Sequence, residues 1–159
     1  MKVREVTPEV DTDTLLAGAQ FTDAYHLETD DRTLTARRAA ERMIGRPPRW
    51  VDALLTFRNI LVAPFGLKTS GASQTEPRDM IGMFPVLSET PNRLVAGFND
   101  KHLDFRVVVD VATSGASQGV TATTLVLTHN LLGRSYLAVI LPLHRLIVRS
   151  MLRRVAARS

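Results

Sequence analysis

Two periodicities meet near the C-terminal end of the chain. From Gly119 to His129 the residues are mainly Thr, Val, Leu and Ala in the alternating pattern of a strand. From Asn130 to Arg158 apolar residues recur at helical spacing, and arginines follow one stripe. A long helix of this kind needs an apolar surface to cover, and the preceding strands can supply one. The pattern therefore predicts a sheet that is covered by a C-terminal helix.

Apolar and polar residues of the C-terminal helix separate into two stripes. The apolar stripe comprises Tyr136, Leu137, Ile140, Leu141, Leu143, Ile147, Val148, Met151 and Leu152. Pro142 falls on the opposite, arginine-bearing stripe, where its ring would bend the helix convex toward solvent. If the segment is helical throughout, its roughly 26 residues would span about 40 Å, enough to cross a small domain.

Alternating residues before Gly119 predict three further strands with one apolar face, and a turn around residues 90–91 would add Leu87 and Met83 to that face. If residues 100–101 form a turn, Ala96 faces Phe105, and apolar residues match across the pair. A slip of one residue would place Asp104 on that face, which burial penalises. The sequence therefore predicts an antiparallel sheet in which the odd-numbered residues of 103–109 point inward.

The same apolar face is predicted to extend over the strand that precedes the helix. A loop centred near Ala116 would set Phe105 opposite Leu127. In the same register Leu103 opposes His129, so His129 would point inward where the helix begins. The outer face would then carry five apolar residues that hint at a homodimer, namely Phe84, Val86, Val95, Val108 and Val126.

Turn and cap signals divide the first half of the chain into shorter elements. Residues 1–13 are polar and are predicted to form a flexible segment, followed by a single domain over residues 14–159. A strand is expected over Ala19–Glu28 and a helix over Leu34–Ile44, with Asp31 or Thr33 as its cap. A second short helix is expected to start at Pro48.

Composition excludes several kinds of chemistry. The chain has no cysteine, so disulfides, thiol nucleophiles and Cys-ligated metals are excluded. Its four histidines form no cluster with metal-ligand spacing, and no Gly-x-Ser-x-Gly elbow or Gly-rich phosphate loop is present. We therefore expect neither a metal nor a cofactor.

Charge is distributed unevenly along a chain whose net charge is +4. Residues 1–32 contain eight acids against three bases, whereas six arginines and no acid follow Asp110. Such arginines could meet nucleic acid or anionic lipid. We interpret them instead as a solvated helix face that the acidic N-terminal segment partly neutralises, and we expect no nucleic-acid partner.

Neither a membrane span nor a secretory signal is predicted. The longest apolar run, Tyr136–Leu143, is much shorter than the roughly 20 residues that a span needs. Residues 1–4 are followed by acids and not by an apolar run. We therefore expect a cytoplasmic protein without an integral membrane segment.

The predicted order is a strand, two short helices, an antiparallel meander and a long C-terminal helix, which is the helix-grip arrangement of α+β proteins. Several stretches also carry a family resemblance: Gly45–Trp50, Phe57–Asn59, Phe84–Leu87, Lys101–Arg106, Thr128–Asn130, Gly133–Tyr136 and Pro142–Val148. Through them the chain resembles the bacterial family known as domain of unknown function 2867. We group that family with the START-like, polyketide-cyclase-like proteins, so the resemblance implies a hydrophobic cavity between a curved sheet and the C-terminal helix. No residue role carries over, because the family has no established mechanism.

Eight residues are predicted to contribute to such a cavity. The residues expected to line or gate it are Trp50, Phe105, Leu127, His129, Tyr136 and His144. Arg106 or Arg134 is available for a polar head group.

The histidines that are candidates for a site also have a structural interpretation. His129 would act as a base if the protein is an enzyme, but its imidazole could equally bond to nearby backbone while Asn130 caps the helix. His144 borders the arginines, where histidines are usually structural. His102, Asp104 and Arg106 share the outer face, where cross-strand polar pairing is the ordinary interpretation.

Three functions remain open at this point. The leading hypothesis is binding of a small hydrophobic or amphipathic molecule between the sheet and the C-terminal helix. The second is an enzyme of the cyclase or hydrolase kind that uses the same cavity with His129 as base. The third is a non-catalytic interaction module that forms a homodimer through the outer sheet face or presents the arginine stripe of the C-terminal helix to anionic surfaces.

Overall fold

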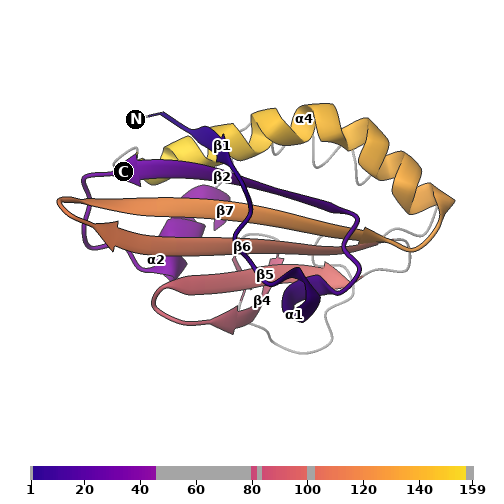
Figure 1. Ribbon diagram of the computed structural model, residues 1–159, viewed down its shortest axis with the longest axis horizontal. Coiled ribbons are helices and arrows are strands. Elements are labelled where there is room, and N and C mark those ends of the chain that lie inside the picture. Colours follow the sequence, from indigo (N-terminus) through magenta and orange to yellow (C-terminus); the bar gives the residue numbers. More distant parts are fainter. Residues whose placement is uncertain (1, 46–79, 82–83, 100–102, 157–159) are drawn as a thin grey trace.

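The computed structural model of the protein describes residues 2–45, 80–81, 84–99 and 103–156. Its framework is a seven-stranded antiparallel sheet in the order β1-β2-β7-β6-β5-β4-β3, crossed on one side by a long helix (Figure 1). The strands are β1 (Arg4–Val6), β2 (Phe21–Thr29), β3 (Met80–Ile81), β4 (Phe84–Glu89), β5 (Arg93–Asn99), β6 (Leu103–Ser114) and β7 (Ser117–Thr128). The helices are α1 (Thr12–Leu16), α2 (Ala36–Ala40) and α4 (Leu131–Ala156), and η1 (Glu41–Gly45) is a π-helical turn. The predicted α+β class, antiparallel sheet and long C-terminal helix are confirmed.

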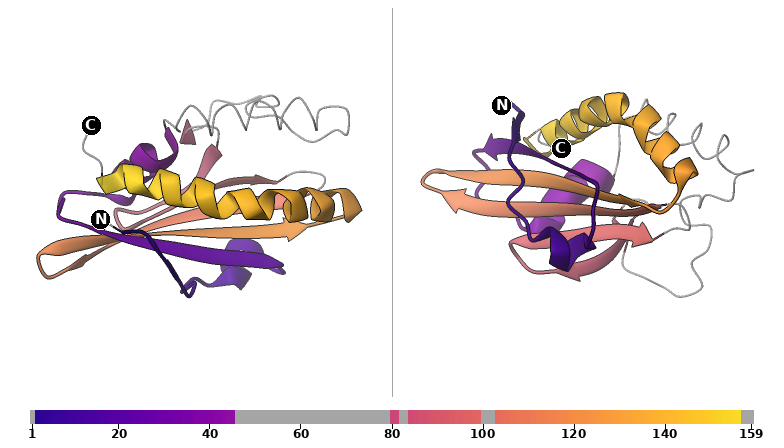
Figure 2. Two further views of the ribbon diagram at one scale, coloured as in Figure 1. Left: turned by 90° about the horizontal axis from the view of Figure 1, so that it is seen from above. Right: turned by 45° about the vertical axis from the view of Figure 1, so that its right-hand side comes forward.

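The sheet has two differently covered faces (Figure 2). We call the face that carries α2, η1 and α4 the inner face, and the face that carries α1 the outer face. On the inner face Val107 and Val109 of β6 belong to one core with Val148 and Leu152 of α4. The main core therefore lies between the middle of the sheet, α2 with η1, and the C-terminal half of α4.

The short helix predicted at Leu34–Ile44 is present as α2 followed by η1. Its N-cap is Thr35, whose hydroxyl accepts a backbone N–H at 3.2 Å, and neither Asp31 nor Thr33 takes that role. The second short helix, expected from Pro48, lies outside the described residues.

α4 begins where the sequence predicted and is curved (Figure 2). The side-chain oxygen of Asn130 accepts the N–H of Gly133 at 3.0 Å, so Asn130 caps the helix as expected. Pro142 is on the exposed side, where the loss of its N–H lets the helix bend toward the sheet. Most of the fully buried positions of α4 lie in its last third, at Val148, Leu152 and Val155.

The N-terminal segment is more structured than its polar sequence suggested. Within residues 1–13, β1 pairs with β2 and the first turn of α1 begins. Leu16 of α1 then packs on Val95, Val108 and Leu125 of the outer face. Val95 and Val108, two of the five residues that hinted at a homodimer, are thus covered by α1 of the same chain.

The parity predicted for β6 is confirmed. Leu103, Val107 and Val109 are buried, and Phe105 packs against the inner core. Phe105 pairs with Phe98 of β5 and not with Ala96. This shift of two residues keeps the same side chains on the same face, because side chains alternate with a period of two.

The register predicted for β7 is wrong by one residue. The turn contains two residues, with Gly115 at φ 59° between the paired Ser114 and Ser117. Glycine at the first central position is what a type II′ hairpin turn requires. Leu103 therefore opposes Thr128, and His129 follows the strand on the side of the outer face.

A β-bulge in β4 overturns the prediction that Leu87 points inward while Phe84 and Val86 point outward. The register shifts between Val86 and Ser88, so Val86 and not Leu87 opposes Ala96. Phe84 and Val86 consequently pack on the inner core. Val126 also faces inward, opposite Phe105, so none of the five residues marks a free outer surface, and the homodimer stays a prediction.

Candidate functional site

A partly buried imidazole and a buried carboxylate meet where α4 crosses β2. The His144 Nε2 atom lies 3.1 Å from Asp23 Oδ2 and 3.2 Å from Asp23 Oδ1. The two side chains are only 16% and 8% exposed. The ring of Phe21, two residues before Asp23 on β2, lies nearly perpendicular to the imidazole, with the ring centroids 5.5 Å apart. One side of this polar pair is thus in contact with an aromatic ring.

Tyr25 adds a second polar group to the same side of β2. Its ring is fully buried, and its hydroxyl has no hydrogen-bond partner in the described part of the chain. Burial raises the pKa of this hydroxyl, and the nearby Asp23 carboxylate raises that pKa further, so the group remains a donor at neutral pH. The Arg149 guanidinium lies over the ring, 5.4 Å from its centroid. An unsatisfied buried hydroxyl costs about 1–3 kcal/mol, and such groups are uncommon in folded proteins.

Three phenylalanines form the apolar part of the site. The rings of Phe84, Phe98 and Phe105 are stacked, with centroids 5.2–6.0 Å apart. All three are half-buried on the inner face. Aromatic side chains in this arrangement offer a large apolar contact surface to a ligand.

Strand pairing connects the phenylalanines to the polar pair. Phe98 is paired with Phe105, Phe105 with Val126, and Val126 with Phe21. This row crosses four strands, so its ends are about 14 Å apart at roughly 4.8 Å per strand. We call this row, together with Asp23, Tyr25 and His144, the inner-face site. It has an aromatic end and a polar end.

The neighbouring row consists of smaller side chains. Ala96, Val107, Thr124 and Asp23 follow one another across the same four strands. Thr124 is buried and lies directly beside Asp23 in the sheet. The polar end of the inner-face site therefore holds a carboxylate, an imidazole and two hydroxyl-bearing residues.

Three of the predicted site residues lie on the opposite face of the sheet. His129 Nε2 lies 3.0 Å from Asp104 Oδ1, and the imidazole is 38% exposed. Arg106 donates to the carbonyls of Phe98 and Phe105 at 3.2 and 2.9 Å. Leu127 packs beside the cluster under α1. The prediction that His129 points into the inner cavity is wrong, because the β7 register is shifted by one residue.

Of the other predicted residues, three lie on α4 and one on β6. Phe105 and His144 belong to the inner-face site. Tyr136 is half-buried on α4, whereas Arg134 is exposed. Trp50 lies outside the described residues.

Sequence reasoning did not identify Asp23 and Tyr25. A signal was nevertheless present, because Phe21, Asp23, Tyr25 and Leu27 alternate along the predicted first strand and therefore share one face. A carboxylate in an otherwise apolar series of that kind indicates a buried charge that needs a partner.

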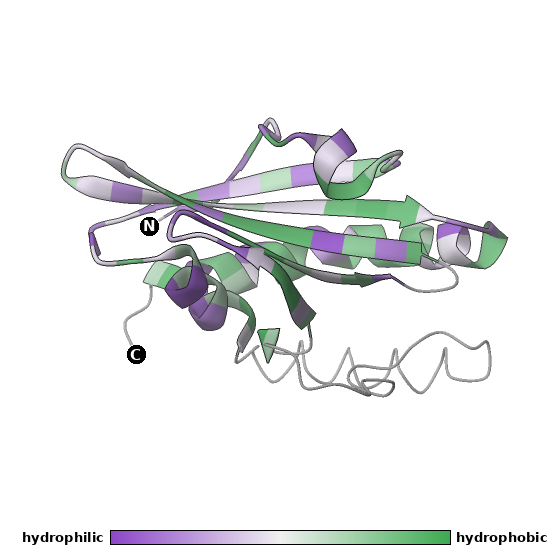
Figure 3. Ribbon diagram, turned by 90° about the horizontal axis from the view of Figure 1, so that it is seen from below, coloured by the Kyte–Doolittle hydropathy of each residue, from purple (hydrophilic) through white to green (hydrophobic). Residues whose placement is uncertain are grey.

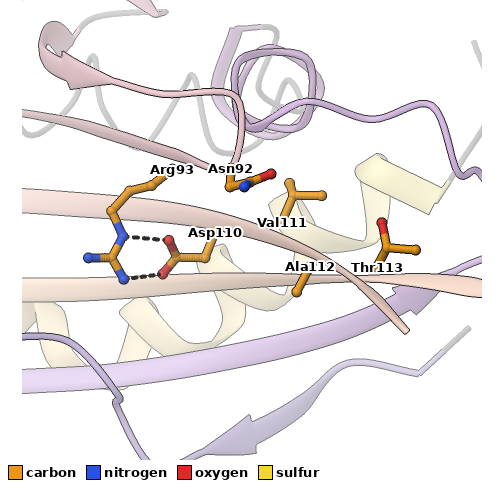
Figure 4. A pocket seen from close by; sticks show the side chains of 6 residues that line it. All are labelled: Asn92, Arg93, Asp110, Val111, Ala112 and Thr113. Carbon is orange, nitrogen blue, oxygen red and sulfur yellow. Dashed lines mark hydrogen bonds and ion pairs between the residues drawn. The ribbon is translucent and has the colours of Figure 1, made fainter. Parts of the chain in front are cut away.

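A separate hollow of about 610 Å³ lies at the edge where β5 begins and β6 ends (Figure 4). Its charged groups already satisfy each other, since Arg93 donates to Asp110 at 2.6 and 3.1 Å. The hydrogen bonds to Asp110 raise the pKa of Arg93 and keep it charged. The other lining residues are Asn92, Val111, Ala112 and Thr113. The hollow thus presents no charge without a partner, and the inner-face site is the stronger candidate.

Metal binding has no support within the described ranges. There, no three His, Asp or Glu side chains come together in a way that could hold a metal ion.

Comparison with known proteins places the chain in a family. The profile of the family described as "Protein of unknown function (DUF2867)" matches residues 15–151. No curated protein matched. A solved structure titled "Crystal structure of conserved protein from Geobacillus kaustophilus" is similar at 11% identity and a TM-score of 0.39, covering 86% of this chain and 93% of that one. Since the family profile spans most of the sequence, the chain belongs to the DUF2867 family.

Proposed function

We propose that the protein binds a small amphipathic molecule at the inner-face site, in the manner of START-like helix-grip proteins. One observation carries this proposal: a single row of paired residues links the stacked Phe98 and Phe105 to Phe21, which contacts His144. Such a row offers apolar contact at one end and directional hydrogen bonding at the other.

The polar end favours a ligand whose head group accepts a hydrogen bond. The Tyr25 hydroxyl is protonated and has no described partner, so it can donate to a carbonyl, hydroxyl or carboxylate oxygen. Arg145 and Arg149 act electrostatically on the same hydroxyl and would favour an anionic head, whereas Asp23 would oppose it. A single-chain molecule with a body of about 14 Å would span the row.

Displacement of a fluorescent probe tests this proposal. Anilinonaphthalene sulfonate is bound first and then displaced by decanoate or decanol. Phe105→Ala should weaken the binding of both competitors, because it removes apolar contact area. Leu127→Ala is the matched control, since Leu127 lies on the outer face. Equal loss of binding in both variants, or no displacement by either competitor, would contradict the proposal.

Tyr25→Phe separates binding from folding. If the hydroxyl serves a ligand, this variant should bind decanoate about fivefold more weakly, the equivalent of one hydrogen bond. It should at the same time be as stable as the wild type or more stable, because the buried hydroxyl has no described partner to lose. A loss of stability without a loss of affinity would oppose the role of Tyr25 in binding.

A second candidate function is an enzyme of the cyclase or hydrolase kind, centred on His144 and no longer on His129. The contact between the His144 imidazole and the Asp23 carboxylate is the arrangement that orients a general base. Hydrolysis of nitrophenyl esters by the wild type and by His144→Gln tests it. Turnover that the substitution abolishes would favour catalysis. If the wild type shows no more turnover than the variant, the enzyme hypothesis is rejected and only the binding hypothesis remains.

A further inference from the structure

We propose that the exposed side of α4 docks on the surface of an anionic membrane. Large apolar residues remain in contact with solvent along this helix: Leu131 is 76% exposed, Val139 74%, Leu146 53% and Leu143 38%. At 3.6 residues per turn these four fall on one side, opposite the buried Val148, Leu152 and Val155. Leu143, which the sequence pattern placed on the stripe that covers the sheet, lies instead at the edge of this exposed side. Figure 3 shows hydrophobic residues over much of α4, with polar residues between them. We call these four residues the docking stripe.

Arginines accompany the docking stripe. Arg134, Arg145 and Arg153 are exposed, and Arg149 is half-buried. No acidic residue follows Asp110 in the sequence, so nothing on α4 offsets their charge. An apolar stripe with arginines at its border is the composition of helices that lie in the interface of a bilayer with anionic lipids.

The packing of α4 favours docking over insertion. By length and composition alone α4 could cross a membrane. However, Val148, Leu152 and Val155 are buried against the rest of the protein, and His144 is paired with Asp23 of β2. Insertion would break these contacts and would place arginines in the hydrocarbon, at about 2.5–3.5 kcal/mol for each at the centre of the bilayer. A helix that lies flat keeps the contacts and buries only its exposed side.

Charge also disfavours a second copy of the chain as the occupant. In a twofold symmetric contact the same surface meets itself. The arginines beside one docking stripe would then face those beside the other, without an acid on either helix. An anionic lipid surface supplies the opposite charge. This proposal does not depend on the proposed function.

Vesicle co-sedimentation tests the proposal. The full chain should sediment with vesicles that contain phosphatidylglycerol at low salt, and much less with pure phosphatidylcholine or at high salt. Val139→Asp should lower the partition coefficient about tenfold, because it removes apolar burial at the centre of the docking stripe. Leu87→Asp is the matched control, since Leu87 is also an exposed apolar residue, at 43%, but lies on β4.

Substitution of arginines tests the electrostatic part separately. Arg134→Gln and Arg153→Gln should each lower binding about fivefold. Arg38→Gln, an exposed arginine of α2, should leave it unchanged. The circular dichroism spectrum of every variant should match that of the wild type, which checks that the fold is retained.

Several results would overturn the proposal. They are equal binding to neutral and anionic vesicles, equal loss of binding in the control variants, and absence of sedimentation. A dimer in size-exclusion chromatography that Val139→Asp dissociates, without any vesicle binding, would assign the docking stripe to a second copy.

Discussion

The imidazole of His144 on α4 lies 3.1 Å from the carboxylate of Asp23 on β2. These residues are 121 positions apart in the sequence. The contact lies beside an apolar core, so it joins the covering helix to the sheet by a directional polar interaction. It also fixes where the polar end of the inner-face site can be.

Removal of one partner of this buried pair should be costly. His144→Leu would leave the Asp23 carboxylate nine-tenths buried without its partner, and we expect the free energy of unfolding to fall by about 3 kcal/mol. Urea unfolding measures the change. His129→Leu is the control, because it breaks the more exposed contact to Asp104 and should cost at most about 1 kcal/mol. Similar losses in both variants would show that burial does not distinguish the two pairs.

Stability should depend on the protonation of His26. Burial lowers the pKa of His26 below 6.5, and the charge of Arg4 lowers it further. The unfolded chain then binds the proton more readily, so this contribution is fully present above pH 6.5 and is lost as the pH falls through the lower folded pKa. His26→Gln should flatten the pH dependence of urea unfolding below pH 6.5, and Arg4→Gln should flatten it in part. An unchanged slope in both variants would contradict this assignment.

Gly97 should tolerate no side chain. It adopts φ 155° on β5, and a Cβ there would lie 2.1 Å from the carbonyl oxygen of Phe105. Gly97→Ala should therefore destabilise the protein by about 3 kcal/mol or more, because the strands must separate. Gly115→Ala is the control. Its φ is also positive, at 59°, but a Cβ there would have no atom within 4 Å apart from those of its chain neighbours. Only the backbone cost of about 1 kcal/mol is therefore expected. Thermal or urea unfolding compares them, and equal losses would contradict a steric cause.

The sequence predicted the faces of β6 but not those of β7, for a physical reason. On β6, charged residues such as Asp104 and Arg106 alternate with apolar ones, so burial permits only one orientation. On β7, threonines, valines and leucines occupy both faces, and the length of the turn decides the register. Gly115 can start a two-residue turn or sit in a longer loop, and the local sequence does not distinguish them.

The candidate site could be predicted only in part. Periodicity predicted Phe105 and His144 as site residues, because Phe105 lies on the apolar face of its strand and His144 at the border of the apolar stripe of the helix. The partner of His144 depends on where α4 lies along the sheet, a long-range relationship that no local pattern encodes. The inward position of Phe84 depends on the bulge after Val86, which likewise leaves no clear mark in the sequence.

Amide chemical shifts during a titration with decanoate test the central claim most directly. Residues of the two faces alternate along the same strands, so the titration reports which face binds. We predict saturable shifts centred on Tyr25, Val107 and Thr124 of the inner face and on the α4 residues around His144. Shifts centred on Thr22, Val108 and Leu127 of the outer face, or no saturable shift at all, would contradict binding between the sheet and α4.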